Sequence, residues 1–398
     1  MLRKILITSL FVSLFAGTCI AQIAVKADTL YTMAGAKITD GVVLINNNKI
    51  EAVGPASSTE IPDDYQVHEA IVVTPGLIDA HSVVGLAGIK NQDSDQDQLE
   101  TSSAMQPELR AIDAYNAREE LVKFLMNKGI TTVHTGHGPG ALASGQTMIA
   151  KTSYNTVEEA VIDSATMVAF TLGSGISSDF KTPGTDAKGV AILRQQFIKA
   201  QEYVEKRSSD DAPSKDLSME VMADVLEGKI KALFTAQTAQ DILTAIRLQK
   251  EFGFDLVLDG AAEAYLVMDE IKAAGVPVII HPTMVRTYGG TKNASFETAG
   301  KISETNIPLA FQSGFEAYVP KTRVVLYEAA LAAANGLERE AALRALTIEA
   351  AKILGIDSRV GSIEEGKDAD LVLFDDDPFE YTTHIEKVII DGKVVKGN

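Results

Sequence analysis

The sequence predicts an α/β protein: a (β/α)8 TIM-like barrel joined to a small β-sandwich domain that both ends of the chain build together. Two observations support this prediction. The middle of the chain alternates short apolar segments with segments of helical periodicity, whereas both ends contain only short, strand-like segments. We therefore expect residues 22–73 and 358–398 to form the sandwich and residues 74–357 to form the barrel.

Residues 1–21 have the pattern of a secretory signal peptide. Two basic residues precede an apolar stretch, residues 5–16, that is too short to span a membrane, and small residues lead to a cleavage site after Ala21. We expect the mature chain to be exported from a Gram-negative bacterium, to the periplasm or beyond, with no membrane span. Lipidation of Cys19 is the alternative, but the residues before this cysteine lack the leucine usual in lipoproteins.

The composition argues against several classes of function. The chain of 398 residues has 54 acidic and 36 basic side chains, a formal net charge of −18, and no prominent basic cluster, so nucleic acid is not an expected partner. Tryptophan is absent and aromatic residues make up 6%, which argues against a surface built for stacking. Cleavage after Ala21 removes the single cysteine, Cys19, so we expect neither disulfides nor a thiolate-bound metal.

The terminal segments are typical of β-structure. The N-terminal segments alternate in polarity and are interrupted at Gly35, Gly41 and Gly54-Pro55. The C-terminal segments DADLVLFDDDP and KVIIDGKVV have the same character, and Asp391-Gly392 predicts a two-residue hairpin turn. Two strand-rich ends around a different middle indicate one composite β domain.

The middle of the chain contains the eight strands that a parallel barrel requires. Helical patterns lie between several of them, for example in residues 239–253 and 261–275, each of which ends at a glycine suited to a helix C-cap. The predicted strands are residues 77–83, 131–136, 147–152, 165–173, 231–237, 255–260, 277–283 and 308–314.

Two long connections interrupt the regular alternation, at residues 85–106 and 173–186. Both follow predicted strands, so they would lie at the carboxyl-terminal face of the barrel, where the loops that form active sites are found.

The histidines indicate where chemistry would occur. Four of the six lie at or just beyond the ends of predicted strands, namely His81, His134, His137 and His281. Imidazole is the commonest metal ligand, so this clustering favours a metal site, and the alternative is a hydrogen-bonded polar cluster at the barrel mouth. His68 and His384 lie in the terminal segments, where we expect surface positions.

Several segments carry a resemblance to a known family. They are VVTPGLIDAH (72–81), LTIEAAKILGI (346–356), VGSIEEGKDADLVLFDDDPF (360–379) and the closing VIIDGKVV. With these segments the chain resembles the amidohydrolase superfamily, particularly its imidazolonepropionase-like and prolidase-like branches. The resemblance implies a metal-bearing barrel and hydrolysis of a C–N bond by a metal-activated water.

The resemblance also implies a set of metal-binding residues, and this chain retains only one of them. The first histidine of the family matches His81, whereas the other positions carry different residues. In chain order these are Val83, Thr235 or Gln237, Asp259 and Gly314. Because a zinc site needs about three protein ligands, His81 alone cannot hold a metal.

Other residues could rebuild the site. His81, His134 and His137 form the most compact candidate set for one divalent metal, with zinc the simplest choice. The alternative is a metal-free site in which Asp259 and His281 act as an acid–base pair.

Three further residues, Gln237, Glu316 and Tyr318, are candidate substrate contacts.

Two functional hypotheses follow. The first is an exported hydrolase that cleaves amide, lactam or dipeptide-like bonds at an atypical or relocated metal site. The second, favoured by the substituted ligands, is a catalytically inactive barrel that binds a small molecule or serves as a partner subunit. We expect either self-association or association with a related amidohydrolase chain.

Overall fold

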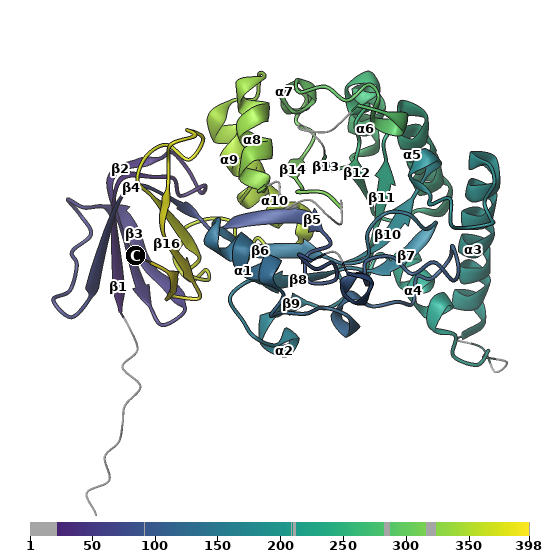
Figure 1. Cartoon of the computed structure of the whole chain (residues 1–398), viewed down its shortest axis with the longest axis horizontal. Helices are drawn as coiled ribbons and strands as arrows, with labels where there is room; N and C mark the ends of the chain where they lie inside the picture. The colour runs from purple at the N-terminus through teal and green to yellow at the C-terminus, as the bar shows by residue number, and fades with distance from the viewer. Residues whose placement is uncertain are drawn as a thin grey trace, which may run out of the picture.

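The computed structural model describes residues 22–90, 92–207, 209, 212–281, 287–315 and 324–397. Strands from both ends of the chain form one sheet, and the other elements form an α/β body beside it (Figure 1). The predicted signal peptide lies outside the described residues. Among the helices in these ranges, none is both long enough and apolar enough to cross a membrane.

The terminal sheet has seven strands in the order β17-β16-β15-β4-β1-β2-β3. The two chain ends meet where β15 pairs antiparallel with β4, with Leu371 opposite Pro75. The predicted hairpin turn is present, because Asp391 and Gly392 have φ angles of 48° and 69°, the left-handed values that such turns require. The strands are β1 (Ile23–Leu30), β2 (Ile38–Asn46), β3 (Lys49–Pro55), β4 (Gln66–Pro75), β15 (Leu371–Phe374), β16 (Ile385–Ile390) and β17 (Lys393–Lys396).

The sandwich prediction needs correction in one respect. Residues from both ends do assemble the sheet, as expected. Within the described ranges, however, these strands share one continuous hydrogen-bonded ladder rather than dividing into two separate sheets.

The α/β body contains all eight predicted strands, distributed over two sheets. The six-stranded sheet has the order β14-β13-β12-β11-β10-β7, and the four-stranded sheet has the order β5-β6-β8-β9. Pairing is parallel from β10 to β14 and between β5 and β6. The strands are β5 (Leu77–Ser82), β6 (Ile130–Thr135), β7 (Ala143–Gln146), β8 (Met148–Lys151), β9 (Val161–Asp163), β10 (Met167–Thr171), β11 (Lys231–Ala236), β12 (Leu256–Gly260), β13 (Val278–Ile280) and β14 (Leu309–Phe311).

The third predicted strand departs from the (β/α)8 pattern, in which all strands are parallel. It is β8, which is antiparallel to β6, and the strand just before it, β7, is antiparallel to β10. The chain from β6 to β8, residues 136–147, contains β7 and no helix that could serve as the crossover of a parallel pair. A continuous eight-stranded ring is therefore not formed by the described residues, and the two sheets meet through isolated contacts such as the Ser82–Gly314 bridge.

The strands nevertheless enclose a common apolar interior. Side chains alternate along each strand, so one set points inward and the other packs under the helices. Helix α10 (Ile348–Leu354) adds apolar side chains to the same cluster. The inward side chains of the strands are Ile78, Ala80, Ile149, Met167, Leu233, Val257, Ile279 and Ala310.

The helices cover the outside of these strands (Figure 1). The first predicted helical segment is α5, which begins after Thr238, whose side chain accepts from Asp241 N, and ends at Gly253 with φ 81°. The second is divided into the turn η4 and α6, which ends at Gly275 with φ 66°.

The α-helices are α1 (Glu120–Asn127), α2 (Val157–Ala160), α3 (Asp186–Arg207), α4 (Leu217–Leu226), α5 (Ala239–Phe252), α6 (Met268–Ala274), α7 (Thr298–Ser303), α8 (Val325–Ala334), α9 (Arg339–Ala345) and α10. The short 3-10 helices are η1 (Asp93–Asp95), η2 (Ala111–Asp113), η3 (Gly173–Gly175), η4 (Ala264–Leu266) and η5 (Gly289–Thr291).

A buried ion cluster joins the terminal sheet to the α/β body. Lys151, at the end of β8, has a side chain that is only 2% exposed, and its Nζ lies 2.9 Å from Asp368 and 3.1 Å from Asp370. It also contacts Asp391 in the β16–β17 turn. Burial by itself lowers the pKa of Lys151, but the neighbouring carboxylates raise it above its ordinary value, so the ammonium stays charged.

Replacing Lys151 with methionine tests this cluster. The variant leaves buried carboxylates without their cation, so we expect a loss of about 3–5 kcal/mol in the free energy of unfolding, measured by urea denaturation. The matched control is Lys206→Met, since Lys206 is 64% exposed and should contribute no more than about 1 kcal/mol. Equal stability of the two variants would contradict the role assigned to Lys151.

Candidate active site

The four predicted histidines all lie at the carboxyl ends of strands and are all buried. His81 is on β5, His134 on β6, His137 in the loop after β6, and His281 directly after β13. Their exposed fractions are 0%, 0%, 5% and 6%. The strand ends therefore bring these imidazoles to one region of the α/β body, as the sequence predicted.

Asp259, on β12, is the centre of the site. Its Oδ1 accepts hydrogen bonds from His81 Nδ1, at 3.0 Å, and from Gln312 Nε2, and its Oδ2 accepts from Thr235 Oγ1 at 2.7 Å. The donors come from β5, from β11 and from the segment after β14. A fully buried carboxylate is costly unless it is hydrogen-bonded, and these contacts supply the hydrogen bonds.

A bulge in β5 turns His81 toward Asp259. Between Asp79 and Ser82, three steps along β5 correspond to two steps along β6, from Val133 to Thr135. Such an extra residue re-aims the side chains beside it. Simple alternation along the strand does not give this orientation.

The contact with Asp259 fixes the tautomer of His81. A carboxylate oxygen only accepts, so His81 Nδ1 carries the hydrogen and the lone pair of the neutral ring is on Nε2. His81 Nε2 is buried and has no hydrogen-bond partner among the described residues. The ring of Phe315 lies edge-on to His81, with the centroids 4.7 Å apart. The site thus contains one buried basic nitrogen to which no described residue donates a hydrogen bond.

His134 has a structural role. Its Nδ1 donates to Ala80 O and its Nε2 accepts from Thr147 Oγ1, both at 2.6 Å. Burial lowers the pKa of His134 to about 3, so the ring is neutral at ordinary pH. Because both nitrogens are used, His134 joins β5, β6 and the β7–β8 junction, and has no lone pair left for a metal.

The other two histidines do not join Asp259. The ring of His137 lies over Gly145, where an added Cβ would be 2.4 Å from His137 Cδ2. Burial lowers the pKa of His137. The main-chain nitrogen of His281 donates to Gly260 O at 3.1 Å. The imidazole paired with Asp259 is that of His81 rather than the predicted His281.

These side chains do not fit the predicted metal site. The nitrogens of His134 are occupied, the oxygens of Asp259 are satisfied, and Gly314 has no side chain. In the part of the chain that the structure describes, no group of three or more His, Cys, Asp or Glu residues is placed to hold a metal ion. Since zinc needs about three protein ligands, His81, His134 and His137 are not assembled as a ligand set.

The predicted substrate contacts have different outcomes. The side chain of Gln237 covers Gly260, and its Oε1 accepts from Ala262 N at 3.3 Å, so it fixes the loop after β12. Glu316 and Tyr318 lie outside the described residues.

The first long connection packs beside the site. Gln106 N donates to Ala143 O at 2.9 Å, and Gly138 N donates to Gln98 O at 2.8 Å. The connection therefore lies against the loop between β6 and β7, consistent with its predicted place at the strand ends.

Sequence reasoning missed two residues after β14, Gln312 and Ser313. Gln312 donates to Asp259, while Ser313 donates to Asp79 through both its main-chain N, at 3.1 Å, and its Oγ. The available signal was the polar FQSG segment at a strand end, where only Gly314 was considered. Burial raises the pKa of Asp79 to about 7, although the hydrogen bonds from Ser313 partly oppose this.

Asp79 should make stability depend on pH. Because its pKa is raised in the folded chain, its contribution is complete below about pH 4 and is lost as the pH rises to about 7. Asp79→Asn removes this loss, so the variant should gain stability relative to wild type between about pH 5 and about pH 8, measured as melting temperature. A difference that stays constant over this range would contradict the assignment.

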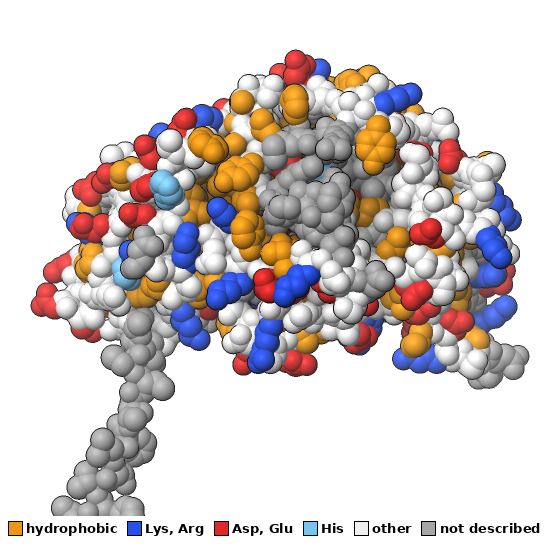
Figure 2. Space-filling view, viewed as in Figure 1, with side chains coloured by type: hydrophobic (Ala, Val, Ile, Leu, Met, Phe, Trp, Pro, Cys, Tyr) orange, Lys and Arg blue, Asp and Glu red, His pale blue; other side chains and the backbone are white. Residues whose placement is uncertain are grey.

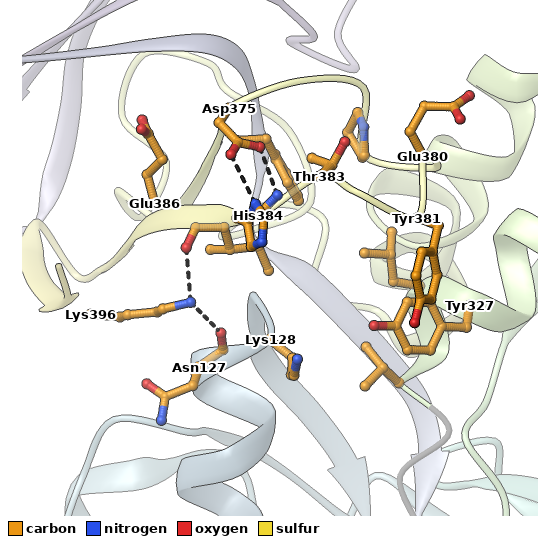
Figure 3. Close-up of a pocket in the computed structure, with 15 residues that line it drawn as sticks. Asn127, Lys128, Tyr327, Asp375, Glu380, Tyr381, Thr383, His384, Glu386 and Lys396 are labelled. Atoms are coloured by element: carbon orange, nitrogen blue, oxygen red, sulfur yellow. Dashed lines mark hydrogen bonds and ion pairs between the residues drawn. The ribbon is translucent and has the colours of Figure 1, made fainter. Parts of the chain in front are cut away.

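A separate cavity of about 450 Å³ lies at the boundary between the terminal sheet and the α/β body (Figure 3). Lys396 Nζ donates to Asn127 O at 3.0 Å and to Ile385 O at 2.9 Å, and His384 contacts Asp375. Figure 2 shows hydrophobic side chains near the same boundary, with acidic and basic side chains intermixed on this face. Of these contacts, that from Lys396 to Asn127 crosses the boundary, and none of the predicted site residues lines this cavity.

The chain is similar to several known proteins. Residues 311–395 match the amidohydrolase family. The crystal structure of an amidohydrolase from Thermotoga maritima MSB8 is 30% identical in sequence, with a TM-score of 0.88, and the match covers 94% of this chain and 100% of that chain.

More distant relatives agree with this result. An imidazolonepropionase from Shewanella frigidimarina (strain NCIMB 400) is 25% identical over 87% of this chain and 89% of that protein. Amidohydrolase tasK from Hapsidospora irregularis is 24% identical over 88% of this chain, and the match spans 39% of that longer protein. The structure of a Xaa-Pro dipeptidase with bound methionine, at 16% identity and a TM-score of 0.59, shares the fold.

Proposed function

We propose that the substrate of this chain is a small amide, lactam or dipeptide-like compound that is cleaved at His81. The premise is that the chain belongs to the amidohydrolase superfamily and is a hydrolase of carbon–nitrogen bonds. The observation that carries the proposal is the buried His81 Nε2, whose lone pair is directed by the contact between His81 Nδ1 and Asp259. The relatives support the substrate class, since they include an imidazolonepropionase and a Xaa-Pro dipeptidase.

The reaction begins with a water whose proton moves to His81 Nε2 as its oxygen bonds to the amide carbonyl carbon. The resulting tetrahedral intermediate then takes this proton from His81 onto the leaving nitrogen. The C–N bond breaks, and the products are a carboxylic acid and an amine. Asp259 stabilises the imidazolium between the two proton transfers, because the opposite charges are in contact.

The surroundings of His81 favour this chemistry. His81 and Asp259 are both fully buried, and Phe315 covers one edge of the imidazole. Charged contacts are stronger where water is excluded, so the carboxylate has a greater effect on the imidazolium than it would have at the surface. A buried base also restricts access, which supports a small substrate.

Activity should depend on both members of the pair. We expect His81→Ala to lower kcat/KM by about 10²- to 10⁴-fold on whichever compound of a panel of dipeptides, N-acyl amino acids and lactams is hydrolysed. Asp259→Asn presents an amide donor to His81 Nδ1 and so favours the wrong tautomer, which should cause a comparable loss. The control is His384→Ala, because the His384 side chain is 80% exposed and distant from the site. Wild-type rates in the His81 variant would reject the assignment.

The alternative function is that of a binding module or partner subunit without catalysis. It is favoured by Gly314, which offers no carboxylate where the family resemblance implies one. In that case the wild-type chain would hydrolyse nothing in the panel and would co-purify from its native cell with a related amidohydrolase.

We also propose that the chain is exported. The basis is the apolar pattern of residues 1–21 with cleavage after Ala21. N-terminal sequencing of protein from the periplasmic fraction should then begin at Gln22. Recovery of the intact N-terminus from the cytoplasm, or of a chain lipidated at Cys19, would contradict this proposal.

A further inference from the structure

Two side chains that donate to the same oxygen of Asp259 each carry a second, buried atom that accepts hydrogen bonds. His81 Nδ1 and Gln312 Nε2 both donate to Asp259 Oδ1, so their side chains lie side by side. The remaining end atoms of the two side chains are His81 Nε2, across the ring from Nδ1, and Gln312 Oε1, on the same amide carbon as Nε2. Both residues are fully buried, and neither end atom has a hydrogen-bond partner among the described residues.

Both end atoms accept hydrogen bonds. The orientation of the Gln312 amide is fixed, because exchanging its oxygen and nitrogen would place two acceptors against each other at Asp259. A buried acceptor without a donor destabilises the folded chain, so we expect these two acceptors to bind a group that donates two hydrogens. A water molecule is the smallest such group.

We propose that His81 Nε2 and Gln312 Oε1 hold one water and that this water is the nucleophile of the hydrolysis. The inference rests on the proposed function and adds Gln312 to it as a catalytic residue, since Gln312 would touch the reacting water. The water donates one hydrogen to each acceptor, which leaves an oxygen lone pair directed at the substrate. As this oxygen bonds to the carbonyl carbon, the hydrogen shared with His81 moves to Nε2, and the other remains on the oxygen beside Gln312.

This arrangement assigns activation of the water to protein side chains. It is consistent with the donor set of the described residues, in which no group of three or more His, Cys, Asp or Glu is placed to hold a metal ion. Thr235 completes the arrangement by donating to the other oxygen, Asp259 Oδ2, at 2.7 Å. The carboxylate therefore keeps two donors, from Thr235 and His81, when Gln312 is replaced.

Gln312→Met is the decisive variant, because it keeps the volume of the side chain and removes the acceptor. A matched control is Gln196→Met, since Gln196 on α3 also has a buried Oε1 without a partner among the described residues but lies outside the site. Crystal structures that resolve bound water should show one water on both His81 Nε2 and Gln312 Oε1 in wild type and in Gln196→Met, and none there in Gln312→Met. A wild-type structure without this water, or with a metal ion on His81 Nε2, would overturn the inference.

The kinetic test uses chelator-treated protein and the same amide panel. We expect Gln312→Met to lower kcat by about 10²-fold with KM nearly unchanged, because the water is no longer held in line. Turnover by wild type with no effect of Gln312→Met would contradict this inference alone. Absence of turnover in wild type would contradict the proposed function, while the crystal structures would still decide whether the two acceptors hold a water.

Discussion

Bulk water does not reach the carboxylate of Asp259, so protein groups must supply its hydrogen bonds, and this requirement organises the site. Thr235 comes from the neighbouring strand β11, whereas His81 belongs to the four-stranded sheet and Gln312 follows β14. One carboxylate thus ties β5 of the four-stranded sheet to the six-stranded sheet. It also orients the imidazole, so the cost of burying Asp259 is offset by hydrogen bonds that build the reactive group.

A buried charge must also be paired on the side of the four-stranded sheet that faces the terminal sheet. There the buried group is a cation, Lys151, and its partners are carboxylates of the terminal sheet, Asp368 and Asp370. Both clusters connect segments that are more than a hundred residues apart in the chain. The four-stranded sheet is therefore held by Asp259 on the side of the site and by carboxylates on the side of the terminal sheet.

Much of the fold could be predicted from the sequence because each strand is a short apolar run bounded by turn residues. The antiparallel direction of the third strand could not, because it follows from a connection without a crossover helix rather than from strand propensity. For the site, the sequence located the histidines but could not separate His81 from His134, since both end apolar strands. What separates them is tertiary structure: a bulge beside His81, and Ala80 and Thr147 around His134. Gln312 was missed because an amide acquires its role here only through contact with Asp259.

The charges of the residues at the strand ends are matched to one another. A site built around a divalent cation can hold several carboxylates, because the ion compensates their charge. Around Asp259 the partners are one imidazole and the neutral groups of Thr235 and Gln312, which suits a single carboxylate. Asp79, the other carboxyl group near these strand ends, has its pKa raised to about 7 and is paired with Ser313, so at neutral pH it is partly protonated. Gly314, two residues after Gln312, has no side chain and so adds no second permanent carboxylate to this set.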